Sequence, residues 1–194
     1  MRFLEANDEA IKAAGYMMRE GGVVVYPTET VYGIGCLPSD PDATQRICEI
    51  KQRADKPLPL ICADVVAARK IVEMTSEAEK LAAKFWPGPL TLVLKSKVKY
   101  GMWVTHGAST LGVRVSPHTV AQKLAKAAGG VIISTSANVS GDPPAKSAEE
   151  ARKIFDGKVD IILDGGPSQG GESSTVVDLS SEEIWLLRRG PVTG

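Results

Sequence analysis

Two short polar clusters contain the residue types that could do chemistry in this sequence. The first is Lys51-Gln52-Arg53, and the second is Ser134-Thr135-Ser136-Ala137-Asn138. An ammonium group supplies a compact positive charge, and a guanidinium presents a planar fork to two phosphate oxygens. Hydroxyls and an amide can bind further phosphate oxygens or a ribose. Together these side chains could hold an anionic phosphate ligand.

Each cluster also has a purely structural explanation. Lys51 and Arg53 suit the solvated C-terminal end of a helix, where cations interact favourably with the helix dipole. The hydroxyls of the second cluster could satisfy their own backbone in a turn. However, the second cluster directly follows the apolar segment 131–133, and ligands in open α/β sheets bind beyond the carboxyl ends of strands. Its position therefore favours a binding site and leaves the turn open as an alternative.

The pattern of apolar residues predicts alternating helices and strands. Continuous apolar runs at 23–26 and 131–133 are typical of strands buried on both faces. Capping boxes at Ser76 to Glu79 and Ser147 to Glu150 predict two helix starts. Further helices are expected to begin near residues 7, 39 and 117, and further strands at 58–63, 90–94, 111–115, 161–163, 175–177 and 184–187. The result is a single α/β domain over residues 1–194, with a twisted mixed sheet and flanking helices.

Composition narrows the class of protein. Apolar residues make up 43% of the 194 residues and charged residues 24%, which is ordinary for a globular protein. Positive and negative side chains both number 23, so the net charge is zero and no global field favours nucleic acid. No signal peptide and no apolar run of about 20 residues is present, so we expect a cytoplasmic location without membrane contact.

Conventional catalytic machinery is absent from the sequence. The three cysteines form no C-x-x-C pair, and only two histidines occur, so no metal site made of protein ligands is predicted. Residues 166–170 match the G-x-S-x-G pattern, but both histidines lie upstream, which argues against a hydrolase triad. No Walker A motif occurs either, so a nucleotide would have to be held in another way.

Six ordered segments resemble the YrdC/Sua5 family, and the resemblance as a whole runs from about Asp8 to Gly190. The segments are 26–33, Lys51-x-Arg53, 85–91, 112–115, 135–141 and 174–178. The resemblance implies a YrdC-like fold around a large concave cavity, in the short single-domain form of the family. It also implies an L-threonylcarbamoyladenylate synthase, which converts L-threonine, bicarbonate and ATP into threonylcarbamoyl-AMP and pyrophosphate. A tRNA-threonylcarbamoyl transferase complex would then use this product in the t6A modification of tRNA.

The resemblance also assigns roles to individual residues. Lys51 and Arg53 correspond to the catalytic phosphate contacts of the family. The full set of ATP-binding residues that it implies is Lys51, Arg53, Pro57, Thr110, Ser136, Asn138, Pro144 and Arg188. The threonine pocket that it implies is Thr30, Cys62, Arg114, Ser134 and Ser174.

Two details of that assignment need comment. Many members carry a histidine near the position of Cys62, so the contact from Cys62 departs from the family pattern. Mg²⁺ is expected to arrive with ATP, because no carboxylate cluster in the sequence forms an obvious metal cage.

Two alternative functions belong to different classes. The first is a maturation factor that binds double-stranded RNA or ribosomal RNA through a basic concave face. Zero net charge and the lack of interleaved aromatic and basic residues argue against strong binding, although some RNA contact stays open. The second is the related carbamoyl-transfer domain of hydrogenase maturation, which normally sits within a much larger chain.

Overall fold

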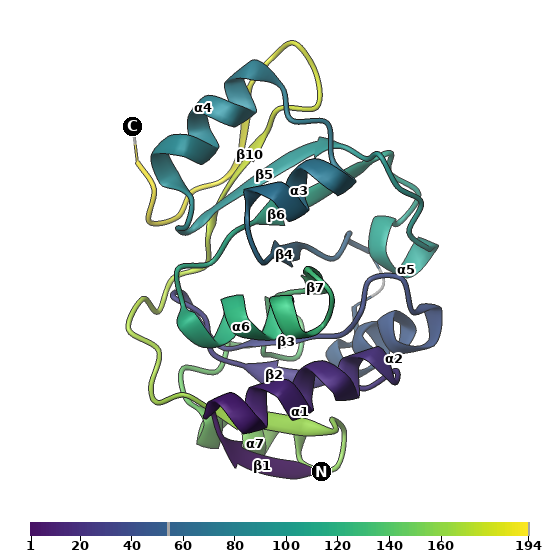
Figure 1. Ribbon diagram of the computed structural model, residues 1–194, viewed down its shortest axis with the longest axis vertical. Coiled ribbons are helices and arrows are strands. Elements are labelled where there is room, and N and C mark those ends of the chain that lie inside the picture. The colour runs from purple at the N-terminus through teal and green to yellow at the C-terminus, as the bar shows by residue number, and fades with distance from the viewer. Residues whose placement is uncertain (54, 194) are drawn as a thin grey trace.

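A computed structural model describes residues 1–53 and 55–193 (Figure 1). Its strands form two mixed β-sheets. In spatial order the first sheet contains β1 (Arg2–Glu5), β9 (Ile161–Asp164), β2 (Val24–Tyr26), β3 (Gly33–Gly35) and β8 (Thr135–Ser136). The second contains β11 (Trp185–Arg188), β10 (Thr175–Asp178), β5 (Leu90–Lys95), β6 (Thr110–Arg114), β4 (Leu60–Cys62) and β7 (Val131–Ile133).

The predicted α/β class with mixed sheets is confirmed, but the strands form two sheets rather than one. The division occurs at Ser134, where one extended segment changes sheets. Ile133 pairs with Leu60 in the second sheet, whereas Thr135 pairs with Ile34 in the first. The spacing of apolar residues predicts that a segment is buried, but it does not predict which strand the segment pairs with. The crossing between the sheets could therefore not be predicted from the sequence.

Helices flank both sheets. They are α1 (Asp8–Arg19), α2 (Pro41–Lys51), α3 (Val65–Ile71), α4 (Ser76–Phe85), α5 (Met102–Thr105), α6 (Thr119–Ala127) and α7 (Ala148–Phe155). Ser147 caps α7 as predicted, because its hydroxyl accepts a hydrogen bond from the Glu150 N–H at 3.1 Å. The predicted cap of α4 was wrong by one residue: Thr75, not Ser76, accepts from the Ala78 N–H at 3.2 Å.

Five short elements were not predicted from the sequence: β1, β3, β8, α3 and α5. Two of these elements show why they could not be recognised from the sequence. β3 has the sequence Gly-Ile-Gly, which carries almost no apolar signal, and β8 contains only two residues. Both nevertheless border the site described below.

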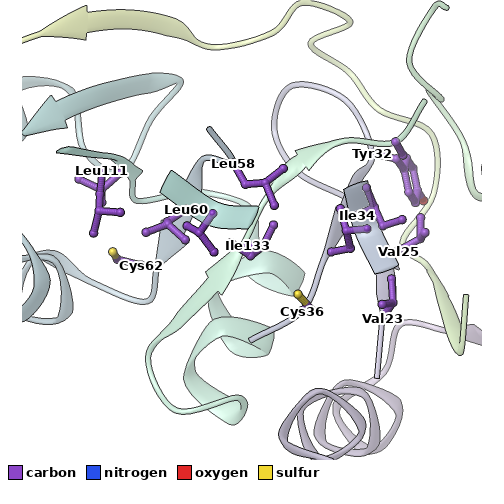
Figure 2. Close-up of a cluster of buried hydrophobic side chains, with 14 of the residues drawn as sticks. Val23, Val25, Tyr32, Ile34, Cys36, Leu58, Leu60, Cys62, Leu111 and Ile133 are labelled. Carbon is purple, nitrogen blue, oxygen red and sulfur yellow. The ribbon is translucent and has the colours of Figure 1, made fainter. Parts of the chain in front are cut away.

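One cluster of buried apolar side chains spans both sheets (Figure 2). Val25 and Ile34 contribute to it from the first sheet, and Leu60, Leu111 and Ile133 from the second. No helix among residues 1–53 and 55–193 is both long and apolar enough to cross a bilayer. The single-domain organisation stays a prediction, and its boundary at Gly194 lies outside the described residues.

Candidate active site

Polar residues from both sheets line one pocket. In the first sheet, the loop between β2 and β3 contributes Thr30, and β8 contributes Ser136. In the second sheet, β6 contributes Arg114. Ser134, at the crossing between the sheets, and Ser174, just before β10, complete this polar lining. The cavity volume of the pocket is about 100 Å³, and the pocket opens to solvent on one side. The sheet crossing is therefore what brings the hydroxyl cluster to the pocket.

Gly35 and Tyr26 make the sheet crossing possible. A Cβ atom on Gly35 would lie 2.0 Å from the carbonyl oxygen of Ile133, so a larger residue could not fit there. The same carbonyl oxygen accepts a hydrogen bond from the Tyr26 hydroxyl at 2.9 Å. These two contacts fix the position from which Ser134 enters the pocket.

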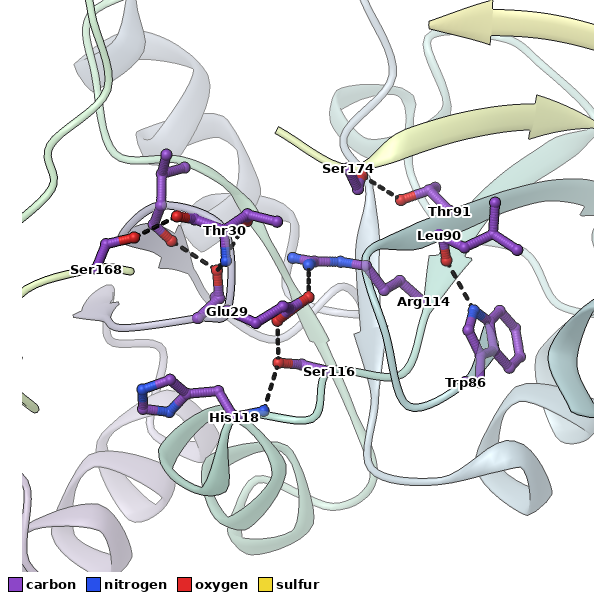
Figure 3. Close-up of polar contacts among 12 residues, drawn as sticks. Glu29, Thr30, Trp86, Leu90, Thr91, Arg114, Ser116, His118, Ser168 and Ser174 are labelled. Carbon is purple, nitrogen blue, oxygen red and sulfur yellow. Dashed lines mark hydrogen bonds and ion pairs between the residues drawn. The ribbon is translucent and has the colours of Figure 1, made fainter. Parts of the chain in front are cut away.

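Arg114 is held in the pocket by the partly buried carboxylate of Glu29 (Figure 3). Its Nη1 pairs with Oε1 of Glu29, and the Arg114 residue is only 7% exposed. The other carboxylate oxygen of Glu29 accepts a hydrogen bond from the Ser116 hydroxyl at 2.5 Å. Glu29 thus neutralises the charge of Arg114 and fixes the orientation of its guanidinium, while Arg114 still lines the pocket.

Arg188 connects the end of β11 to the same pocket. Its Nε donates to the Ser174 carbonyl oxygen at 2.8 Å, and its Nη2 donates to the Ser174 hydroxyl at 3.1 Å. That hydroxyl also shares a hydrogen bond with the Thr91 hydroxyl at 2.8 Å (Figure 3). Burial lowers the pKa of Arg188, and the nearby charges of Arg114 and Arg53 lower it further.

Arg53 is the third guanidinium at the pocket. Its Nη2 donates to the Pro57 carbonyl oxygen at 2.7 Å, and its Nη1 donates to the Thr135 hydroxyl at 3.3 Å. Burial lowers the pKa of Arg53 as well. Three arginines and no carboxylate line the pocket in the described part of the chain, and Glu29 offsets one of their charges from behind. An anion entering here would relieve the repulsion among them.

Lys51 is not part of the lining of this pocket. It is 1% exposed, and its ammonium donates to the Ser136 carbonyl oxygen at 2.5 Å, the Asn138 carbonyl oxygen at 3.0 Å and Asn138 Oδ1 at 2.6 Å. We call these three residues the loop anchor. Burial, and then the charge of Arg53, lower the pKa of Lys51 to about 7. All three ammonium donors are therefore used within the chain.

The intervening residue explains why Lys51 and Arg53 diverge. Gln52 ends α2 in the left-handed conformation, with φ 53° and ψ 42°. This turn reverses the chain between the two cations, so that the first is buried against the loop 136–138 and the second reaches the pocket.

A second compartment adjoins the first. Its lining includes Pro57, Thr110, Val93 and Gly112, and it shares Arg53 and Arg188 with the first compartment. It is more apolar than the first, as suits a ring system, and the two shared arginines lie between the two spaces. Among residues 1–53 and 55–193, no group of three His, Cys, Asp or Glu side chains is placed to hold a metal ion.

The structure brings most of the predicted site residues together and separates four of them. The polar compartment contains Thr30, Arg114, Ser134, Ser174, Ser136, Arg53 and Arg188, and the apolar one contains Pro57 and Thr110. Lys51, Asn138 and Pro144 line neither compartment.

Cys62 also lies elsewhere. It is fully buried in the apolar core, where Figure 2 shows it beside Leu111, and burial raises its pKa to about 12. Cys62 does not line the polar compartment, and its contact with threonine stays a prediction from the sequence.

Sequence reasoning missed Glu29, Ser116 and Thr91. Glu29 belongs to the segment 26–33 that carried the resemblance, so its type and its place after a buried strand were visible. Its pairing with Arg114 joins residues 85 positions apart and could not be inferred from local sequence.

Comparison with known proteins agrees with this fold. The model of the Sua5/YciO/YrdC family, described as "Telomere recombination", matches residues 16–190. A Threonylcarbamoyl-AMP synthase from Halorhodospira halophila is 40% identical over 80% of this chain and 82% of its own length. The chain therefore belongs to the Sua5/YciO/YrdC family.

Two longer relatives refine the comparison. A Threonylcarbamoyl-AMP synthase from Pyrococcus abyssi is 42% identical over 93% of this chain and 54% of its own length. The crystal structure of P. abyssi Sua5 complexed with L-threonine has a TM-score of 0.94 and 39% identity, covering 98% of this chain and 58% of that one. The chain thus spans about half the length of these relatives.

Proposed function

We propose that the protein synthesises L-threonylcarbamoyl-AMP and pyrophosphate from L-threonine, bicarbonate and ATP, the first step of t6A modification of tRNA. The observation that carries the proposal is the pair of compartments with Arg53 and Arg188 between them. A reaction between two anionic substrates needs this arrangement, since cations must lie where the substrates meet. The names of the relatives and the threonine complex support the same assignment.

The polar compartment suits the amino acid. Arg114 offers a guanidinium already oriented by Glu29, which fits a substrate carboxylate. The hydroxyls of Thr30, Ser134 and Ser174 surround it and can bind the remaining polar atoms of threonine.

The apolar compartment suits the nucleotide. Pro57 and Thr110 would contact the base and ribose, and the phosphates would lie against Arg53 and Arg188. In this arrangement the α-phosphorus faces the polar compartment. Mg²⁺ is proposed to enter with the triphosphate, bound mainly by phosphate oxygens and water.

The chemistry requires no side-chain nucleophile. The threonine amine adds carbon dioxide, derived from bicarbonate, and loses a proton to give a carbamate. A carbamate oxygen then forms a bond to the α-phosphorus while the bond to pyrophosphate breaks. Positioning and charge neutralisation supply the catalysis in such transfers. The cysteines agree with this mechanism, because burial raises the thiol pKa values of Cys36, Cys48 and Cys62 and keeps them protonated.

Two wider assignments belong to the same proposal. The product would pass to a tRNA-threonylcarbamoyl transferase complex, and the protein would act in the cytoplasm. Direct contact with RNA stays a prediction from the sequence.

Release of pyrophosphate tests the proposal. Purified protein with ATP, bicarbonate and Mg²⁺ should release pyrophosphate only when L-threonine is added. D-threonine is the matched control, because it has the same charges and a different arrangement of them. Release that does not depend on L-threonine would overturn the proposed reaction.

A further inference from the structure

The most exposed apolar segment of the molecule lies at the edge of the second sheet. Ile184, Trp185, Leu186 and Leu187 are between 54% and 59% exposed. Successive side chains of a strand point to opposite faces, so exposure of four in a row leaves both faces uncovered, and Leu187 also borders the apolar compartment. A contiguous apolar surface of this kind marks an interaction site more often than it marks ordinary surface.

The backbone of this segment is also available on one side. Among the described strands, β11 pairs only with β10, so its outer edge carries unpaired N–H and C=O groups. Edge strands are usually protected by lysine, proline or inward-pointing charge. The four residues 184–187 include none of these.

The charges around the segment indicate which partner fits. Glu182 and Glu183 precede it, and Arg188 and Arg189 follow it. If a second copy aligns antiparallel with Leu186 on the two-fold axis, Trp185 lies opposite Leu187 of the second copy. Glu183 and Arg189 flank β11. If the pairing continues in the same register beyond both ends of the strand, Glu183 of each copy lies opposite Arg189 of the other. The segment is thus complementary to itself under a two-fold rotation, as an isologous interface requires.

We propose that two copies of this chain pair through β11 and join their second sheets into one continuous sheet. The order of the segment is acidic, then apolar, then basic, and a second copy running antiparallel presents the complementary order by symmetry. A partner of unrelated sequence has no such built-in match. Cross-strand apolar pairs and opposite charges would stabilise the contact together with the new backbone hydrogen bonds.

The pairing would also act on the pocket. β11 ends at Arg188, whose guanidinium holds Ser174 in the polar compartment. Ordering of β11 by a second copy therefore supports Arg188 in its position. Specific activity should fall when the protein is diluted below the dissociation constant of the dimer.

Sedimentation over a micromolar concentration series tests the dimer without reference to the reaction. The protein should sediment at twice its mass of 20.6 kDa at high concentration. Leu186→Lys should weaken association at least about tenfold. Met102→Lys is the matched control: Met102 is 66% exposed on α5, and this variant should associate like the unmodified protein.

A charge exchange tests the register. Glu183→Arg and Arg189→Glu should each weaken the dimer, and the two changes combined in one chain should restore it. A monomer throughout the series overturns the proposal. A dimer that is insensitive to Leu186→Lys, or a double variant no tighter than the single ones, overturns it as well.

Discussion

The loop anchor and the arginine-lined pocket use positive charge in opposite ways. In the anchor, Lys51 gives all three of its hydrogen bonds to acceptors of the chain itself, around Ser136 and Asn138. In the pocket, Arg53 and Arg188 donate to carbonyl and hydroxyl oxygens, and neither guanidinium is paired with a carboxylate in the described part of the chain. Only a left-handed Gln52 separates Lys51 from Arg53. Neighbouring cations can therefore have separate roles, one in shaping the site and one in binding the substrate.

The difference depends on the partner of each charge. A buried cation whose bonds are satisfied internally stabilises the fold and has little left to offer a ligand. A guanidinium that faces a cavity with neutral partners still attracts an anion. Arg114 is intermediate, because Glu29 neutralises it without removing it from the pocket. Substitutions in the two regions should accordingly separate effects on stability from effects on activity.

The largest effect is expected at Glu29. Glu29→Ala leaves Arg114 buried without its carboxylate, which should cost about 3–5 kcal/mol in the free energy of unfolding. Urea denaturation measures this loss. Glu29→Gln is the control, since an amide can still accept from Arg114 and should lose less. A loss below about 1 kcal/mol for Glu29→Ala would show that the pair does not hold the pocket.

Arg53→Ala should mainly affect activity. Removal of a charged phosphate contact should cost at least about 2 kcal/mol of transition-state stabilisation, roughly a 30-fold fall in kcat/KM for pyrophosphate release. The control is Arg69→Ala, because Arg69 forms an exposed pair with Glu79 away from the site. Unchanged turnover of the Arg53 variant would remove this residue from the active site.

Lys51→Met should mainly affect stability. Three acceptors lose their donor, which should lower the free energy of unfolding by about 1–3 kcal/mol. Lys80→Met is the matched control, because Lys80 is exposed and bonds Glu77 on the same helix; it should change stability by less than about 0.5 kcal/mol. Equal stability of the two variants would contradict the loop anchor.

The smallest effect concerns pH. The pKa of Lys51 is about 7 in the folded protein, below the ordinary lysine value of 10.5. Between these values the unfolded chain binds more protons than the folded one, so this lysine makes stability rise with pH, by at most about 1.4 kcal/mol per pH unit. Below pH 7 both states are protonated and the contribution of Lys51 is flat.

Comparison with the Lys51→Met variant isolates the contribution of Lys51 to the pH dependence of stability. The difference in free energy of unfolding between the unmodified protein and the variant should increase from pH 7 to pH 8.5. This window stays below the ordinary thiol pKa of 9.0, above which the buried cysteines act in the opposite direction. A difference that does not change with pH would mean that Lys51 keeps its proton throughout.

The sequence predicted those features that depend on neighbouring residues. Apolar runs located β2, β7 and β9, and hydroxyls at helix starts located the caps of α4 and α7 to within one residue. Arg53 and Arg114, which the resemblance assigned to ATP and to threonine, both line one pocket.

The features that depend on tertiary pairing were not predictable. The crossing at Ser134, the burial of Lys51 and the Glu29–Arg114 pair all join segments far apart in the chain. Cys62 illustrates the same limit, because it was assigned to the threonine pocket from its place in the sequence, whereas its side chain lies in the apolar core.

ATP affinity of two variants tests the central distinction most directly. Binding is measured by calorimetry for Arg53→Ala and Lys51→Met, at a temperature where both are folded. If Arg53 contacts the phosphates and Lys51 anchors the loop, Arg53→Ala should weaken binding at least about tenfold, and Lys51→Met by no more than about threefold. Weaker binding by Lys51→Met than by Arg53→Ala would contradict the account and place Lys51 on the nucleotide.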